Sequence, residues 1–218
     1  MAVAQLDTRP LTLAAYYPES DGKPMTETDA HRKQMINLLV VLEARFRADP
    51  QVYVGGNLMI YYVEGDPKAS IAPDVFVVRG VPKRNRRVYK VWEEGRAPDV
   101  VIELTSRSTR DQDLGSKRWI YAEMGVREYF LFDPLGDYLQ PPLRGYSLTG
   151  DEYIRIAGDG ARIFCETLGL ELRIVDGWLR LADPTTGELL LTPEELAAEV
   201  ERLRAELRSL KSGSQAIT

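Results

Sequence analysis

The stretch APDVVIELTS, residues 97–106, decides the fold, because it is apolar on both faces except for Glu103. A run of this kind predicts a central strand in a sheet that is covered on both sides. An unpaired carboxylate in such a place costs several kcal/mol. We therefore expect Glu103 to be protonated, paired with a cation or bound to a metal ion. A salt-bridged structural glutamate is the plainer alternative.

The tetrapeptide APDV also occurs earlier, at residues 72–75, and the two copies differ in what they can contribute. Asp99 and Glu103 share one face of a strand but lie about 13 Å apart along it. That distance is too long for one ion with oxygen ligands at about 2.1–2.5 Å. Asp74 opens another strand, and antiparallel pairing would bring it beside Glu103. We therefore expect Asp74 to partner Glu103, and Asp99 only to open its strand.

The helix predicted after this strand, over residues 111–124, carries a lysine on its apolar side. Lys117 could point its ammonium group at the two acidic residues. Alternatively, its aliphatic stem covers apolar surface while the ammonium group reaches water. Lys117 shares an arc of the helical wheel with Leu114, Ile120, Tyr121 and Met124.

An earlier amphipathic helix is predicted from Asp29 to about Ala48, before Pro50. His31 lies on its apolar stripe. A single histidine in such a position is commonly a satisfied core residue, and we expect it to be an accessory to the site at most.

The remaining segments predict a β-rich chain. The runs QVYV, LMIYYV, DVFVV and RVYKVW indicate short strands, several of them antiparallel, and REYFLFD indicates a further strand. YSLTGDEYIRI is a hairpin candidate, and LELRIVDGWLRLAD is a stronger one because Asp176-Gly177 separates two apolar runs. We expect these hairpins to extend the sheet.

The chain of 218 residues predicts one compact domain with appendages. Residues 1–28 form a predicted arm, residues 29–190 the domain and residues 191–218 a C-terminal helix, with Thr192 as its cap. This helix carries a heptad seam, which predicts either dimerisation or packing against its own domain. The seam consists of Leu196, Val200, Leu203, Leu207 and Leu210.

Composition limits the function classes. A net charge of −5 argues against a dedicated nucleic-acid coat protein, but not against an enzyme with a local basic groove. The single cysteine, Cys165, excludes an internal disulfide framework and a cysteine-based zinc site. Because the sequence has neither a signal-peptide pattern nor an apolar run of about 18 residues, we expect a cytoplasmic protein without a membrane partner.

The order of motifs resembles a known family. APDV, APDVVIELTS, RDQDLGSKRWIYAEMGV and REYFLFDP are similar to the Uma-type restriction endonucleases, a bacterial branch of the PD-(D/E)xK nuclease superfamily. The resemblance covers the chain from about His31 to the final helix. It implies a restriction-endonuclease-like α/β/α core with a mixed sheet, followed here by a β-rich extension and a terminal amphipathic helix.

The same resemblance implies a Mg²⁺ site, which could also take Mn²⁺, formed by Asp74, Glu103 and the carbonyl of Leu104. The superfamily lysine usually follows the acidic residue by two positions, where this sequence has Thr105. In this branch a lysine of the following helix takes its place, which points to Lys117. The implied activity is metal-assisted hydrolysis of phosphodiester bonds in nucleic acid, with DNA as the expected substrate.

Basic residues between two predicted strands could contact phosphates, or could simply be a solvated loop. Two other functions stay open: a non-catalytic dimeric interaction module on a nuclease scaffold, and a metal-dependent hydrolase of a small phosphate ester. The candidate nucleic-acid contacts are Lys83, Arg84, Arg86 and Arg87, joined by Arg107 and Arg110.

Overall fold

The computed structural model describes residues 15–20, 22 and 28–215. Most of the predicted arm over residues 1–28 therefore lies outside the described residues. The described part of the arm packs on the body, because the Tyr17 ring contacts the Tyr61 ring at 4.9 Å and the Tyr61 hydroxyl donates to the carbonyl of Pro18.

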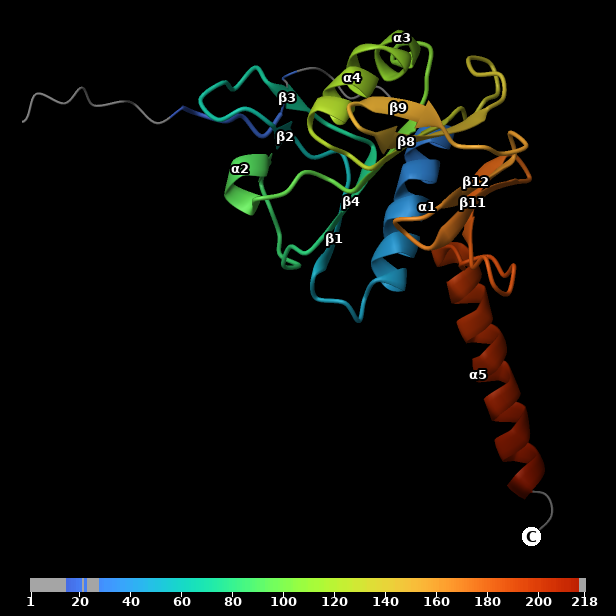
Figure 1. Cartoon of the computed structure of the whole chain (residues 1–218). Helices are drawn as coiled ribbons and strands as arrows, with labels where there is room; N and C mark the ends of the chain where they lie inside the picture. Colours follow the sequence, from blue (N-terminus) through green and yellow to red (C-terminus); the bar gives the residue numbers. More distant parts are fainter. Residues whose placement is uncertain (1–14, 21, 23–27, 216–218) are drawn as a thin grey trace, which may run out of the picture.

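A six-stranded mixed sheet forms the centre of the body (Figure 1). Only β6 and β7 pair in parallel, and the other neighbours are antiparallel. The strands β6 and β7 are buried along their whole length, as the apolar run around Glu103 predicted. In spatial order the strands are β1 (Val52–Gly55), β4 (Val75–Arg79), β6 (Val100–Leu104), β7 (Glu128–Phe132), β8 (Leu143–Thr149) and β9 (Glu152–Arg155).

One face of the sheet is covered by α1 (Asp29–Arg45) and by a separate three-stranded sheet. The Gln34 side chain joins these two elements, since it donates to the Leu179 carbonyl and accepts from the Leu179 N–H, both at 2.9 Å. The separate sheet consists of β10 (Arg162–Cys165), β11 (Leu170–Val175) and β12 (Trp178–Ala182).

Both predicted hairpins are present. The β8–β9 hairpin extends the main sheet, but the β11–β12 hairpin belongs to the separate sheet, so the expected continuous extension is wrong for this part. The turn residues of the β11–β12 hairpin, Asp176 and Gly177, have φ values of 51° and 79°. These positive values are typical of the tight hairpin turn that the Asp-Gly pair predicted. The hairpin packs its apolar side against α1 instead of adding an edge strand.

The other face carries two short helices, α3 (Arg110–Leu114) and α4 (Ser116–Glu123). The sequence predicted one helix over residues 111–124, but the chain breaks at Gly115, where φ is −117° and ψ is −95°. A Cβ atom at Gly115 would come within 2.9 Å of the Asp111 carbonyl oxygen, so a glycine suits this break.

A small sheet and one helical turn lie beside α4 on this face. The predicted strand RVYKVW is wrong in its second half, because residues 91–94 turn into a helix that Gly95 ends with a φ of 71°. The elements are β2 (Ile60–Tyr61), β3 (Ser70–Ile71), β5 (Tyr89–Lys90) and α2 (Val91–Glu94).

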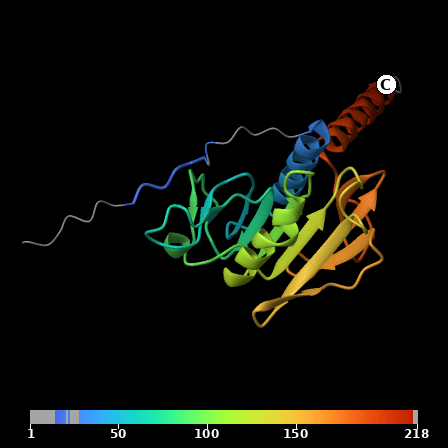
Figure 2. The ribbon, with the colours of Figure 1, turned by 90° about the horizontal axis from the view of Figure 1, so that it is seen from above.

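The last helix, α5 (Pro193–Gln215), leaves the body and runs outward (Figure 1). Viewed from above, it departs on the side where α1 lies (Figure 2). Thr192 caps it as predicted: its Oγ1 accepts from the Glu195 N–H, and the Glu195 carboxylate accepts from the Thr192 N–H. In the part of the chain that the structure describes, no helix is both long and apolar enough to cross a membrane.

Candidate active site

Asp74 and Glu103 meet at one end of the main sheet. Strands β4 and β6 pair in antiparallel fashion with Val75 opposite Ile102. The Asp74 N–H donates to Glu103 Oε2 at 3.3 Å, and the Leu104 N–H donates to Asp74 Oδ2 at 2.7 Å. The sequence-based pairing of these two carboxylates agrees with this geometry.

Asp99 lies at the opposite end of the same strands. Its carboxylate accepts from the Arg79 N–H at 2.7 Å. Arg79 is the last residue of β4, whereas Asp74 stands directly before the first residue of that strand. Arg96 and Arg127 also approach Asp99, each at 3.6 Å. The second APDV aspartate therefore fixes a strand end and takes no part in the cluster around Glu103.

Glu103 is buried and fully engaged. Its Oε1 lies 3.0 Å from Lys117 Nζ and accepts a hydrogen bond from the Tyr121 hydroxyl at 2.5 Å. Burial raises the pKa of Glu103 to about 8, although the charge of Lys117 opposes this shift. Burial thus favours the protonated form of this carboxyl group, whereas Lys117 favours the ionised form.

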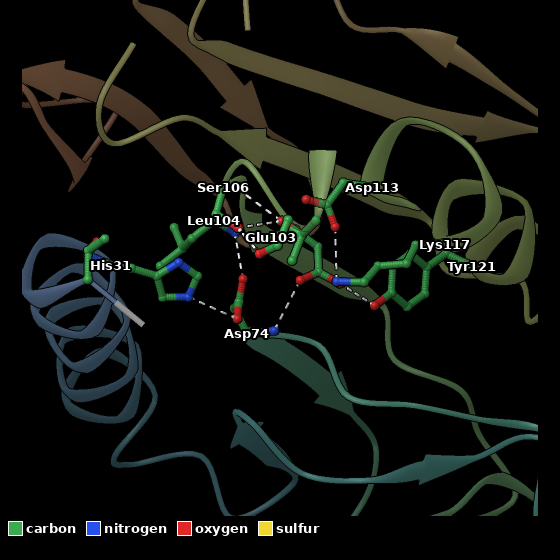
Figure 3. A network of polar contacts seen from close by, with 11 residues as sticks. His31, Asp74, Glu103, Leu104, Ser106, Asp113, Lys117 and Tyr121 are labelled. Atoms are coloured by element: carbon green, nitrogen blue, oxygen red, sulfur yellow. Dashed lines mark hydrogen bonds and ion pairs between the residues drawn. The ribbon is translucent and has the colours of Figure 1, made fainter. Parts of the chain in front are cut away.

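Lys117 points into the site from α4, so of the two sequence-based alternatives the inward one holds (Figure 3). Burial lowers the pKa of Lys117, but Glu103 and Asp113 outweigh burial and raise it. The ammonium group thus stays protonated in this acidic surrounding.

Asp113 is the site residue that the sequence analysis missed. It is fully buried, and its Oδ1 lies 2.9 Å from Lys117 Nζ. Burial raises the pKa of Asp113, and Lys117 opposes that shift. Its four-residue spacing from Lys117 is a signal that could have identified it, because such side chains are neighbours on a helix. The ammonium group thus bridges two carboxyl groups.

His31 reaches the same cluster from the other face of the sheet. Its Nε2 lies 3.2 Å from Asp74 Oδ1, and its backbone N–H is held by the Thr28 side chain at the start of α1. Burial would raise the pKa of Asp74, but His31 and Lys117 lower it below its usual value. As Figure 3 shows, α1 and α4 thus converge on one end of β4 and β6.

The donors at this end suit a hard divalent cation. Asp74 and Glu103 offer carboxylate oxygens, which Mg²⁺ and Mn²⁺ prefer. The Thr105 N–H bonds to Phe132 in β7, so by alternation the carbonyl of Leu104 faces the Asp74 side. Within the described ranges no three acidic, histidine or cysteine side chains are grouped to hold a metal. The Leu104 carbonyl is the further oxygen that this end of the sheet offers.

The basic loop is tied into the fold. Lys83 donates to the carbonyl oxygens of Phe46 and Arg47 at the end of α1. Arg86 is buried, makes two hydrogen bonds to Glu94 and lies 4.2 Å from the centre of the Tyr53 ring.

The other candidate phosphate contacts are more exposed. Arg84 pairs with the same glutamate as Arg86, at 2.7 Å, and Arg87 pairs with Glu19. Arg107 and Arg110 are exposed; Arg107 lies in the loop after β6, and Arg110 is the first residue of α3. Phosphate binding by the basic residues stays a prediction, and Arg107 and Arg110 are the exposed candidates nearest in sequence to Glu103.

A comparison with solved structures supports the fold. The chain is similar to a protein from Anabaena variabilis described as a "putative nuclease belonging to DUF820", with a TM-score of 0.50 and 16% identity. The match covers 67% of this chain and 76% of that chain. The predicted mixed sheet with flanking helices is thus confirmed, and that protein shares this fold.

A family model described as "Uma2: Putative restriction endonuclease" matches residues 14–174. Because this match spans most of the chain, the protein belongs to the Uma2 family. The comparison with curated proteins gave no match.

Proposed function

We propose that this protein is a metal-dependent endonuclease that hydrolyses phosphodiester bonds of DNA at the Asp74–Glu103–Lys117 site. One observation carries the proposal: two carboxylates from neighbouring strands and a buried lysine converge at one end of the sheet. The family and the fold support nuclease activity as a class of function.

Each side chain has a chemical task in this proposal. Asp74, Glu103 and the Leu104 carbonyl would hold Mg²⁺ or Mn²⁺, which supplies an activated water and polarises the scissile phosphate. Lys117 orients the attacking water or stabilises the negative charge that develops on the phosphate. His31 lowers the pKa of Asp74 and fixes the direction of its carboxylate.

Metal titration and plasmid nicking test the proposal together. The wild type is titrated with Mg²⁺ and Mn²⁺ by calorimetry and then incubated with supercoiled DNA. We expect Asp74→Asn and Glu103→Gln to lose metal binding and to nick at least about 100-fold more slowly. Asp111→Asn, an exposed carboxylate on α3, is the matched control and should behave as the wild type. A wild type that neither binds metal nor nicks DNA would overturn the proposal.

A non-catalytic interaction module on the same scaffold is the second candidate. It is favoured by the binding of Lys83, Arg84 and Arg86 within the fold, which leaves fewer cations for phosphates, and by the net charge of −5. Under this alternative the Asp74–Glu103–Lys117 cluster only stabilises the sheet end. Glu103→Gln would then change the melting temperature, and DNA would stay intact with every variant, wild type included.

A further inference from the structure

The heptad seam of α5 is uncovered in the single chain. Exposure along the seam runs from 37% at Val200 to 71% at Leu210. A 23-residue helix that keeps its apolar stripe in water has little to stabilise it, since most helical stability comes from packing of that stripe. The exposed apolar stripe of α5 therefore favours association with a partner that covers it.

The helix is attached to its own body by the opposite side. Lys33 pairs with Glu194 at 3.6 Å, and Arg180 pairs with Glu195 at 2.6 Å. Ala198 lines the groove between α5 and the body. Leu196 and Leu203 define heptad position d. The three attachment residues of α5 then occupy position b (Glu194), position c (Glu195) and position f (Ala198). These positions lie across the helix from the a and d positions, so the seam points away from the body.

The seam has the composition of a two-stranded coiled coil. Val200 and Leu207 occupy position a, and position d is leucine throughout. A β-branched residue at a, together with leucine at d, favours two strands over three or four. A second copy of the same helix is therefore the occupant that fits the seam.

Charges beside the seam select the relative direction of the two helices. Glu199 and Glu206 occupy position g, and Arg204 occupies position e. In a parallel pair, Glu199 of one helix faces Arg204 of the other, which is attractive. In an antiparallel pair, g positions face g positions and glutamates meet. The charge pattern therefore favours the parallel arrangement.

We propose that α5 pairs with α5 of a second copy as a parallel two-stranded coiled coil over residues 196–210. The two bodies then lie at the same end of the coil, related by a two-fold axis along it. This assembly does not depend on the proposed nuclease activity.

Light scattering on the full chain tests the pairing. We expect the wild type to have twice the mass of one chain, and Leu203→Glu combined with Leu207→Glu to halve that mass. Ala205→Glu, at position f on the opposite side, is the matched control and should remain dimeric. The melting temperature of the body should be the same in all three proteins, because residues 201–210 of α5 are exposed. A monomeric wild type, or a double variant that stays dimeric, would overturn the pairing.

Cross-linking tests the direction. Leu210→Cys places a thiol near one end of the seam, so oxidation should link two chains only if the helices are parallel. The wild type is the control, since its single cysteine, Cys165, is buried. A dimeric Leu210→Cys variant that gives no cross-linked product would rule out the parallel arrangement.

Discussion

Asp113 in α3 holds Lys117 in α4 across the break at Gly115, with 2.9 Å between the carboxylate oxygen and the ammonium nitrogen. The Asp113 carbonyl is itself fixed by the Tyr129 hydroxyl at 2.9 Å. The lysine is therefore positioned between two carboxyl groups, Glu103 on the strand and Asp113 on the helix. This contact explains how a lysine outside the strand can serve the site.

Asp113→Asn should slow DNA nicking by about 10- to 100-fold, the range found when the supporting partner of a site group is removed. The reason is that the Lys117 ammonium group keeps only its contact with Glu103, so its position in the site is less well fixed. We expect kcat to fall while the affinity for DNA is unchanged, and Asp113→Glu to recover part of kcat. Equal losses in both variants, matched by equal losses in melting temperature, would show that Asp113 only supports the fold.

Lys117→Met should abolish nicking and lower the free energy of unfolding by about 3–5 kcal/mol. Removing one partner of a buried ion pair leaves the other uncompensated, and here two carboxyl groups lose their cation. Urea unfolding measures the stability change, and Lys68→Met, an exposed lysine, provides the control. Nicking at the wild-type rate by the Lys117 variant would remove this residue from the mechanism.

Glu94→Gln should reveal a pH-dependent contribution to stability. The Arg86 hydrogen bonds lower the pKa of Glu94 below its usual value of about 4.3. A lowered pKa in the folded state stabilises above the unfolded-state pKa, and this stabilisation is lost as pH falls through the folded-state pKa. The variant should therefore be less stable by about 1.5–3 kcal/mol at pH 7, the range for hydrogen bonds to charged groups.

Thermal unfolding of the Glu94 variant and the wild type from pH 7 to pH 3 checks this expectation. The two stabilities should converge toward the acid end. A difference that is the same at pH 7 and pH 3 would mean that the charge of Glu94 contributes nothing.

Arg107→Glu combined with Arg110→Glu should weaken DNA binding and lower the slope of log affinity against log salt by about 2, one for each phosphate contact. Both residues are exposed, and both follow Glu103 within seven positions of the sequence. Fluorescence anisotropy at several salt concentrations measures the slope, and Lys68→Glu, at an exposed lysine in the turn before β3, is the comparison. Unchanged binding would instead favour a small phosphate ester as substrate.

The features that local periodicity determines were the ones best predicted from the sequence. The rise per residue of a strand excluded Asp99, antiparallel pairing placed Asp74 beside Glu103, and the helical wheel put Lys117 on the apolar side of its helix. Neither step needed long-range information beyond one antiparallel pairing. The core of the site could therefore be predicted.

Features that depend on distant partners could not be predicted. The break at Gly115 depends on contact with the Asp111 carbonyl, and the separate sheet exists because its apolar side packs on α1. Likewise, Arg86 looked like a phosphate contact until the fold brought it against Glu94 and Tyr53. The charges of a loop alone do not predict which distant side chains its arginines will contact in the fold.

The two hydrogen bonds between Gln34 and Leu179 join residues 145 positions apart in the chain. Gln34 lies one turn after His31, so the helix that brings His31 to Asp74 is anchored by the last hairpin of the body. During synthesis on the ribosome, this anchor is missing until Leu179 has emerged. A contact of such long range forms late in folding. The nascent chain therefore completes its candidate catalytic site only after the β11–β12 hairpin has been made.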